Sequence, residues 1–223
     1  MDNNNFKNMD PYSTSTGIIE INPELRNIGY ADGINIGGPL SKEKKNEMIN
    51  LAAKKFGEFL DALGCDWKND PNSKETPNRV AKAYVNDLWA GRYNALPKIT
   101  TFPNLEYDGM IFQGNIPLVS MCSHHHQTIM GRVHVAYIPN ERVVGISKLV
   151  RLVDIFAKRM QIQEALTSQI ADTIQEILKP KGVGVVIEAA HQCMTTRGVH
   201  KSGVSMVTMR THGSFRDDTQ TRR

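Results

Sequence analysis

The chain lacks any hydrophobic run approaching the roughly 20 residues that a membrane-spanning helix needs, so no such helix is expected. Residues 1–12 are rich in asparagine and hold no apolar core, which argues against a secretory signal. Cysteine is also scarce: three occur in 223 residues, too few for a disulfide framework. Their expected use is metal binding or catalysis. These absences favour a cytoplasmic protein that does not contact membranes.

Charge of either sign is not in large excess. The chain has 27 Lys and Arg residues and 23 Asp and Glu residues, for a formal net charge of +4. No dense basic stripe accompanies this balance, which argues against a nucleic-acid partner. A mildly basic surface does suit an anionic ligand such as a nucleoside triphosphate.

The N-terminal part divides into a polar stretch and two helical patterns. Residues 1–40 are expected to form a flexible arm. Apolar residues then recur at three- and four-residue intervals over residues 41–64, which predicts a helix. A second helix is expected over residues 76–90, with Thr76 as the N-cap and Pro77 at the first helical position. The predicted domains are the arm (1–40), an N-terminal helical region (41–93) and a catalytic domain (94–223).

The remainder alternates between strand-like and helix-like patterns. The expected strands cover residues 110–121, 131–138, 183–190 and 204–214. The expected helices, between the second and third strands, start at residues 147 and 165 and end near residues 160 and 178. This order of elements predicts an α+β fold with an antiparallel sheet.

Metal-binding side chains gather in two distant segments, residues 122–126 (Cys-Ser-His-His-His) and 191–193 (His-Gln-Cys). Cys122 and His125 follow one predicted strand and Cys193 follows another, so neighbouring strand ends would bring them together. Thiolate and imidazole are the ligands that zinc prefers, and three of them leave a fourth position for water, as in catalytic zinc sites. The alternative is that the cysteines are ordinary buried thiols and the histidines form a surface turn.

Further polar residues fit a nucleotide substrate. His124 and His191 flank the proposed ligands, and imidazole exchanges protons near neutral pH. Gln163 and Glu164 are adjacent, and an amide beside a carboxylate can read the donor edge of guanine, although such pairs usually lie on a solvated helix face. Cations that would suit a triphosphate if they converge, and are simple surface charges if they do not, are Arg79, Lys148, Arg151 and Arg197.

Taken together, these stretches resemble GTP cyclohydrolase I over roughly residues 45–220. The matching segments keep one order and consistent spacing, which makes the resemblance specific. They are residues 76–80, 120–125, 131–140, 145–151, 161–164, 191–194 and 197–199.

The resemblance implies the tunnelling fold, an antiparallel four-stranded sheet with two helices on one face, preceded here by the N-terminal helical region. It also implies a zinc ion held by Cys122, His125 and Cys193, with His124 and His191 as proton-transfer residues. Family members assemble into stacked rings, commonly homodecamers whose active sites are shared between subunits. The other implied roles are guanine binding by Gln163 and Glu164, a catalytic position near the ribose for Ser147, and triphosphate binding by Arg79, Lys148, Arg151 and Arg197.

The implied reaction opens the imidazole ring of GTP. His191 assists protonation at N7, a water activated by zinc attacks C8, and the former C8 leaves as formate. The ribose carbons then rearrange and close onto the amines, giving 7,8-dihydroneopterin triphosphate. This compound is the first intermediate of folate, biopterin-like and deazapurine synthesis.

Several positions depart from the family pattern. Ser123 replaces a common Glu, Ala165 a common Arg, and His126 a usually apolar or aromatic residue, while residues 209–215 are more polar than the common ending. Two alternatives therefore accompany the main interpretation. One is a related tunnelling-fold enzyme acting on another purine or pterin. The other is a non-enzymatic structural-zinc module, which would need a fourth protein ligand.

Overall fold

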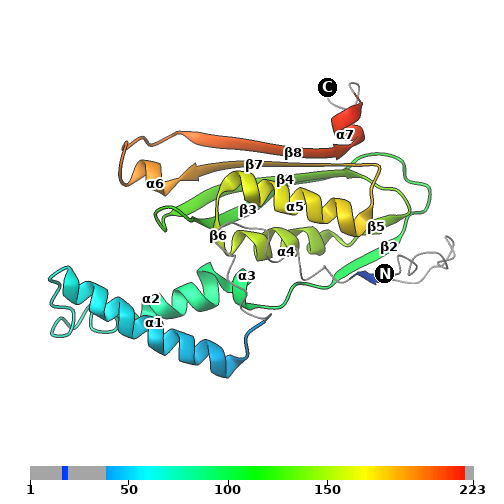
Figure 1. The fold of residues 1–223 in the computed structure, drawn as a ribbon. Helices are drawn as coiled ribbons and strands as arrows, with labels where there is room; N and C mark the ends of the chain where they lie inside the picture. Colours follow the sequence, from blue (N-terminus) through cyan, green and yellow to red (C-terminus); the bar gives the residue numbers. More distant parts are fainter. Residues whose placement is uncertain (1–16, 20–38, 219–223) are drawn as a thin grey trace, which may run out of the picture.

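The centre of the molecule is a five-stranded sheet in the order β6-β3-β4-β7-β8 (Figure 1). The structure is a computed structural model that describes residues 17–19 and 39–218. The four long strands are antiparallel to their neighbours, and the short β6 runs parallel to β3. The predicted four-stranded antiparallel sheet is thus confirmed, with a short strand added at one edge. The bounds are β3 (Ile111–Cys122), β4 (Thr128–Ile138), β6 (Met160–Gln161), β7 (Gly182–His191) and β8 (Ser205–Gly213).

Two helices, α4 (Ile146–Ala157) and α5 (Gln163–Leu178), cover one face of this sheet (Figure 1). α4 packs on β3, and α5 packs on β7 and β8. Leu149, Leu152 and Phe156 recur along α4 with helical spacing and are buried, so this apolar stripe directs the helix onto the sheet. The predicted pair of helices on one face is confirmed.

A second, three-stranded sheet has the order β1-β2-β5, with antiparallel pairing. None of its strands was anticipated from the sequence pattern. β1 falls inside the range predicted to be a flexible arm; the rest of that arm, apart from residues 39 and 40, lies outside the described residues. The strands are β1 (Gly17–Ile19), β2 (Ile99–Pro103) and β5 (Arg142–Val144).

The N-terminal helices form their own small core. Ser41 caps α1 by accepting a hydrogen bond from the Lys44 amide, as expected for a helix that begins there. Thr76 is the first residue of α2 and not its N-cap, which is Glu75; the prediction was wrong by one residue because Pro77 also fits the second position of the first turn. None of the helices in the described ranges is long and apolar enough to cross a membrane. The helices are α1 (Lys42–Ala62), α2 (Thr76–Ala83), the π-helix η2 (Tyr84–Leu88) and α3 (Ala90–Tyr93).

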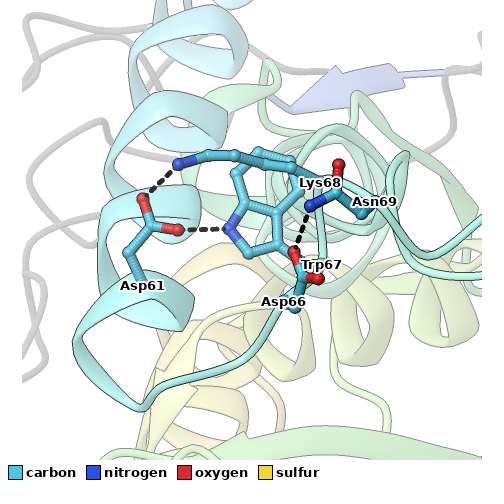
Figure 2. Close-up of polar contacts among 5 residues, drawn as sticks. All are labelled: Asp61, Asp66, Trp67, Lys68 and Asn69. Atoms are coloured by element: carbon cyan, nitrogen blue, oxygen red, sulfur yellow. Dashed lines mark hydrogen bonds and ion pairs between the residues drawn. The ribbon is translucent and has the colours of Figure 1, made fainter.

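The loop after α1 is tied back to the helix by polar contacts (Figure 2). The Asp61 carboxylate accepts a hydrogen bond from the Trp67 indole at 2.9 Å and another from the Lys68 ammonium at 2.8 Å. Within the loop, the Asn69 amide donates to Asp66 at 2.8 Å. These groups are exposed, so the contacts order the loop more than they stabilise the fold.

Gly91 lies where the N-terminal helices meet the sheet domain. Its amide donates to the Lys158 carbonyl at 3.0 Å, and a Cβ at this position would lie 2.0 Å from the Ile155 carbonyl oxygen. Both carbonyls belong to the backbone at the end of α4. Close approach of α3 to α4 therefore requires glycine.

We expect Gly91→Ala to lower the free energy of unfolding by about 1–3 kcal/mol, because backbone carbonyls cannot move aside as a side chain can. Urea denaturation followed by circular dichroism measures this change. Gly184→Ala is the control, since its Cβ would meet nothing closer than 3.7 Å. Equal stabilities of the two variants would contradict the steric argument.

Candidate metal and nucleotide site

The candidate site lies at one edge of the large sheet. β3 and β7 are both antiparallel to β4, which lies between them, so they run in the same direction and end at the same edge. β3 ends at Cys122 and β7 ends at His191, and Cys193 follows in the short helix α6 (Gln192–Thr195). The sequence predicts that two strand ends bring Cys122, His125 and Cys193 together, and the structure places the two cysteines of this set side by side.

The geometry of the sulfurs fits a tetrahedral metal. The two sulfur atoms, Cys122 Sγ and Cys193 Sγ, are 3.9 Å apart. Two thiolates bound to zinc at about 2.3 Å in tetrahedral geometry would be separated by about 3.8 Å. The ligand atoms of Cys122, His191 and Cys193 all lie within 4.8 Å of one another. Two sulfurs and one imidazole nitrogen are a donor set suited to zinc.

Burial shifts the pKa of two of these groups, the Cys193 thiol and the His191 imidazole. Burial raises the pKa of the Cys193 thiol, and the neighbouring Cys122 raises it further. Burial also lowers the pKa of the His191 imidazole, against the opposing effect of the Glu164 carboxylate. The neutral forms of the Cys193 thiol and the His191 imidazole are thus favoured, so a metal ion binding here would have to displace the Cys193 thiol proton.

The turn between β3 and β4 carries the histidine run. The Cys122 amide donates to the Gln127 carbonyl at 2.9 Å, and the His126 amide donates to the Cys122 carbonyl at 3.0 Å. His124 Nδ1 lies 3.9 Å from Cys122 Sγ, so this predicted proton-transfer residue is beside the sulfurs. His125 is not in the group of ligand atoms within 4.8 Å of one another, and its Nε2 accepts a hydrogen bond from the guanidinium of Arg197 at 2.8 Å.

The structure therefore gathers two of the three predicted zinc ligands, Cys122 and Cys193, with His191 in place of His125. The sequence signal for His191 is its position two residues before Cys193. A strand that ends at residue 191 and turns at once into α6 folds the two side chains towards each other.

Gln163 and Glu164 are the first two residues of α5, beside this site, and their side chains lie in different environments. Glu164 is exposed, and its charge acts on His191. Gln163 is only 1% exposed, and its Oε1 lies 2.8 Å from His191 Nε2. In this structure the Gln163 amide, predicted to bind guanine, makes its hydrogen bonds to groups of its own subunit.

Residues at the start of α4 lie away from the cysteines. Ser147 and Lys148 occupy its first turn and Arg151 the next, whereas the far end of α4 leads into β6, which pairs with β3 at Cys122. At 1.5 Å per residue, Lys148 is about 13 Å along the helix from Ala157. Within one chain these groups do not converge with the cysteines.

The other two predicted triphosphate-binding cations, Arg197 and Arg79, lie in different parts of the chain's fold. Arg197 is exposed and reaches the site through His125, while Arg79 is exposed on α2 in the N-terminal helical region. Arg151 lines a separate cavity of about 250 Å³, together with Asp154 and Lys158. Of the four cations, only Arg197 contacts the histidine turn.

His126, one of the departures from the family pattern, packs against aromatic rings. Its imidazole lies 5.4 Å from the Trp89 ring and 6.1 Å from the Tyr84 ring, measured between centroids. These three side chains line part of an apolar cavity of about 380 Å³ between the N-terminal helices. His126 thus links the turn between β3 and β4 to those helices.

Comparison with known proteins agrees with this arrangement. A sequence profile described as GTP cyclohydrolase I matches residues 52–223. The GTP cyclohydrolase 1 of Maricaulis maris is 48% identical over 160 residues, covering 68% of this chain and 77% of that protein. The GTP cyclohydrolase 1 of Brucella suis is 49% identical over 146 residues, covering 64% of this chain and 68% of that protein.

Among solved structures, the apo archaeosine synthase QueF-Like aligns with a TM-score of 0.40 and 19% identity, over 47% of this chain and 93% of that chain. The family assignment depends on the profile match, which spans most of the chain, and on the two bacterial relatives. This chain belongs to the GTP cyclohydrolase I family.

Proposed function

We propose that this chain opens the imidazole ring of GTP, releases formate and forms 7,8-dihydroneopterin triphosphate. The observation that carries the proposal is the pair of cysteine sulfurs 3.9 Å apart beside His191, in a chain of the GTP cyclohydrolase I family. The exposed Glu164 carboxylate, close enough to act on His191, adds a group that can hold the purine base.

Zinc is the proposed metal, with Cys122 and Cys193 as two of its ligands. The third proposed ligand is His125, which follows Cys122 by three residues in the same turn and carries a lone pair on Nε2. A zinc ion bound there supplies a water molecule with a pKa lowered to about 7, acidic enough to provide the nucleophile at neutral pH. With Cys122, Cys193 and His125 as its protein ligands, the site would be of the three-ligand catalytic type and not of the four-ligand structural type.

The chain's own residues orient the substrate and move protons. The Glu164 carboxylate accepts hydrogen bonds from the guanine N1–H and 2-amino groups, which places the imidazole ring of GTP towards the sulfurs. His191, once its free ring nitrogen has also taken up a proton, gives that proton to N7 as the ring opens. His124, exposed to solvent beside Cys122, exchanges protons with the opened intermediate during formyl hydrolysis.

The triphosphate is proposed to bind between subunits of a homodecamer. Ser147, Lys148 and Arg151 lie in the first two turns of α4, whereas the last turn is the one that leads towards the cysteines of the same chain. A neighbouring subunit can present these groups to the site, while Arg197 comes from the subunit that supplies the cysteines. This arrangement anchors base and triphosphate separately, as a reaction with several steps on one bound molecule requires.

The direct test is incubation of zinc-loaded, assembled protein with GTP, following formate release and the ultraviolet band of the pterin. Both products should form together. If neither forms from protein with full zinc content, the GTP reaction is contradicted. Other purines or pterins would then be tested as substrates. Ser123 and Ala165, which depart from the family pattern, would be the first residues to examine.

We expect Glu164→Gln to lower kcat/KM for GTP by about 10- to 100-fold, chiefly through KM, because an amide presents a donor to the donor edge of guanine and loses a charge-assisted hydrogen bond. Steady-state kinetics with GTP measures the effect. Glu176→Gln is the control, an exposed glutamate farther along the same helix. An unchanged KM in Glu164→Gln would remove Glu164 from guanine recognition.

A further inference from the structure

We propose that Gln163 is a positioning residue that fixes the ring orientation and neutral tautomer of His191, and that it does not contact guanine. The reaction role of His191 rests on the proposed function. The hydrogen-bond assignment is independent of the proposed function, because it follows from which atoms face each other in the network around the buried Gln163.

The orientation of the Gln163 carboxamide is fixed by atoms that can only accept. One end of the amide lies 3.1 Å from the Ile187 carbonyl and 2.9 Å from the Met206 carbonyl. Backbone carbonyls do not donate, so this end must be the Nε2 amino group. The opposite end, which faces His191 Nε2 at 2.8 Å, is therefore the Oε1 acceptor.

Two threonines complete the network and agree with this orientation. The Thr167 hydroxyl donates to the Gln163 backbone carbonyl at 2.7 Å. Thr208 lies 2.6 Å from the Thr167 oxygen, and because the Thr167 proton is already used, Thr208 donates to it. The Thr208 oxygen is then free to accept from Gln163 Nε2 at 3.1 Å. Each donor in the network meets an acceptor.

The tautomer of His191 follows. Because Gln163 Oε1 can only accept, His191 Nε2 must carry the ring proton, which leaves the lone pair on Nδ1 in the neutral form. The bond also holds the ring in one orientation at the end of β7, beside the two sulfurs. Such partners of site histidines are known to set both the tautomer and the ring orientation.

Guanine binding by Gln163 would break this network. The side chain would have to leave the Ile187 and Met206 carbonyls, and the part-buried Thr208 hydroxyl would lose its hydrogen bond from Gln163 Nε2. A buried acceptor left unpaired is costly, so the amide is held inside. Recognition of the guanine donor edge is left to Glu164.

Kinetics separates positioning from base binding. Gln163→Met keeps length and volume but removes both hydrogen-bonding ends, so kcat should fall about 10- to 100-fold while KM for GTP stays unchanged. Gln169→Met is the matched control, another buried glutamine of α5, whose partner is Gln161. Its kcat and KM should both stay at the wild-type values. A rise in KM at constant kcat in Gln163→Met would overturn the proposal and assign Gln163 to guanine.

The tautomer is measured directly on the wild-type protein without GTP. Solid-state NMR of assemblies labelled with ¹⁵N in the histidine rings distinguishes protonated from bare ring nitrogens, and His191→Gln identifies the signals of residue 191. We expect the proton on Nε2 in the wild type and a mixture of tautomers in Gln163→Met. A proton on Nδ1 in the wild type would overturn the proposal. This readout stands even if GTP turns out not to be the substrate.

Discussion

Cys193→Ser should yield a protein that purifies without zinc and does not open GTP. A serine hydroxyl stays protonated at neutral pH and is a poor zinc ligand, so the site loses one of its thiolates. The fall in kcat/KM should exceed the roughly 100-fold loss that replacing partners outside the coordination sphere causes. Cys122→Ser should behave in the same way, because its sulfur lies 3.9 Å from that of Cys193. Zinc per subunit, by atomic absorption, and formate release are the two measurements.

Cys65→Ser supplies the matched control. Cys65 is an exposed free cysteine in the loop after α1 and belongs to none of the metal-ligand groups found among the described residues. This variant should keep its full zinc content and activity. If Cys193→Ser retained zinc, or if Cys65→Ser lost as much zinc as Cys193→Ser, the two-cysteine site would be wrong.

The same measurements separate the two imidazoles that compete for the third ligand position. His125→Gln should lose zinc, whereas His191→Gln should keep zinc and lose activity, because His191 is assigned to proton transfer. The opposite pattern would make His191 the ligand, as its place in the group of potential ligands allows. His125 would then be a partner of Arg197.

Much of the fold could be predicted because its main elements are long and periodic. β3, β4, β7 and β8 each contain at least nine residues, and α4 and α5 carry regular apolar stripes. The strands β1, β5 and β6 have two or three residues each, too short for any periodicity. Only their partner strands define them.

The site divides in the same way. Cys122 and Cys193 could be predicted to meet because each lies at or just after the end of a predicted strand of the same sheet. The inward turn of Gln163 could not be predicted, since it depends on carbonyls of β7 and β8 that tertiary packing brings to the first turn of α5. The adjacency of Gln163 and Glu164 in the sequence predicts that both side chains bind the same ligand. In a helix, however, successive side chains point about 100° apart, so the two can face different surroundings.

The distance between α4's first turn and the cysteines leads to a prediction about assembly. We expect two inactive variants to restore activity in each other when they form mixed rings. One is the double variant Lys148→Ala, Arg151→Ala, and the other is Cys193→Ser. If each site combines the α4 cations of one subunit with the cysteines of its neighbour, equal mixing leaves about a quarter of the sites with both halves intact. Co-expression with two affinity tags, followed by tandem purification and a formate assay, measures this activity.

The control pair is Cys122→Ser with Cys193→Ser. Both residues belong to the same half of the proposed site, so a shared site between neighbours cannot be repaired by mixing them. No activity should return in those mixed rings, although they assemble in the same way. Recovery in the first pair and none in the second would require that Lys148 and Arg151 act on the cysteine site of another chain.

If the first pair also stayed inactive in mixed rings with full zinc on the intact subunits, each chain would have to build its own site. Lys148 and Arg151 would then have no part in binding the triphosphate, since within one chain they lie about 13 Å and about 9 Å along α4 from its far end.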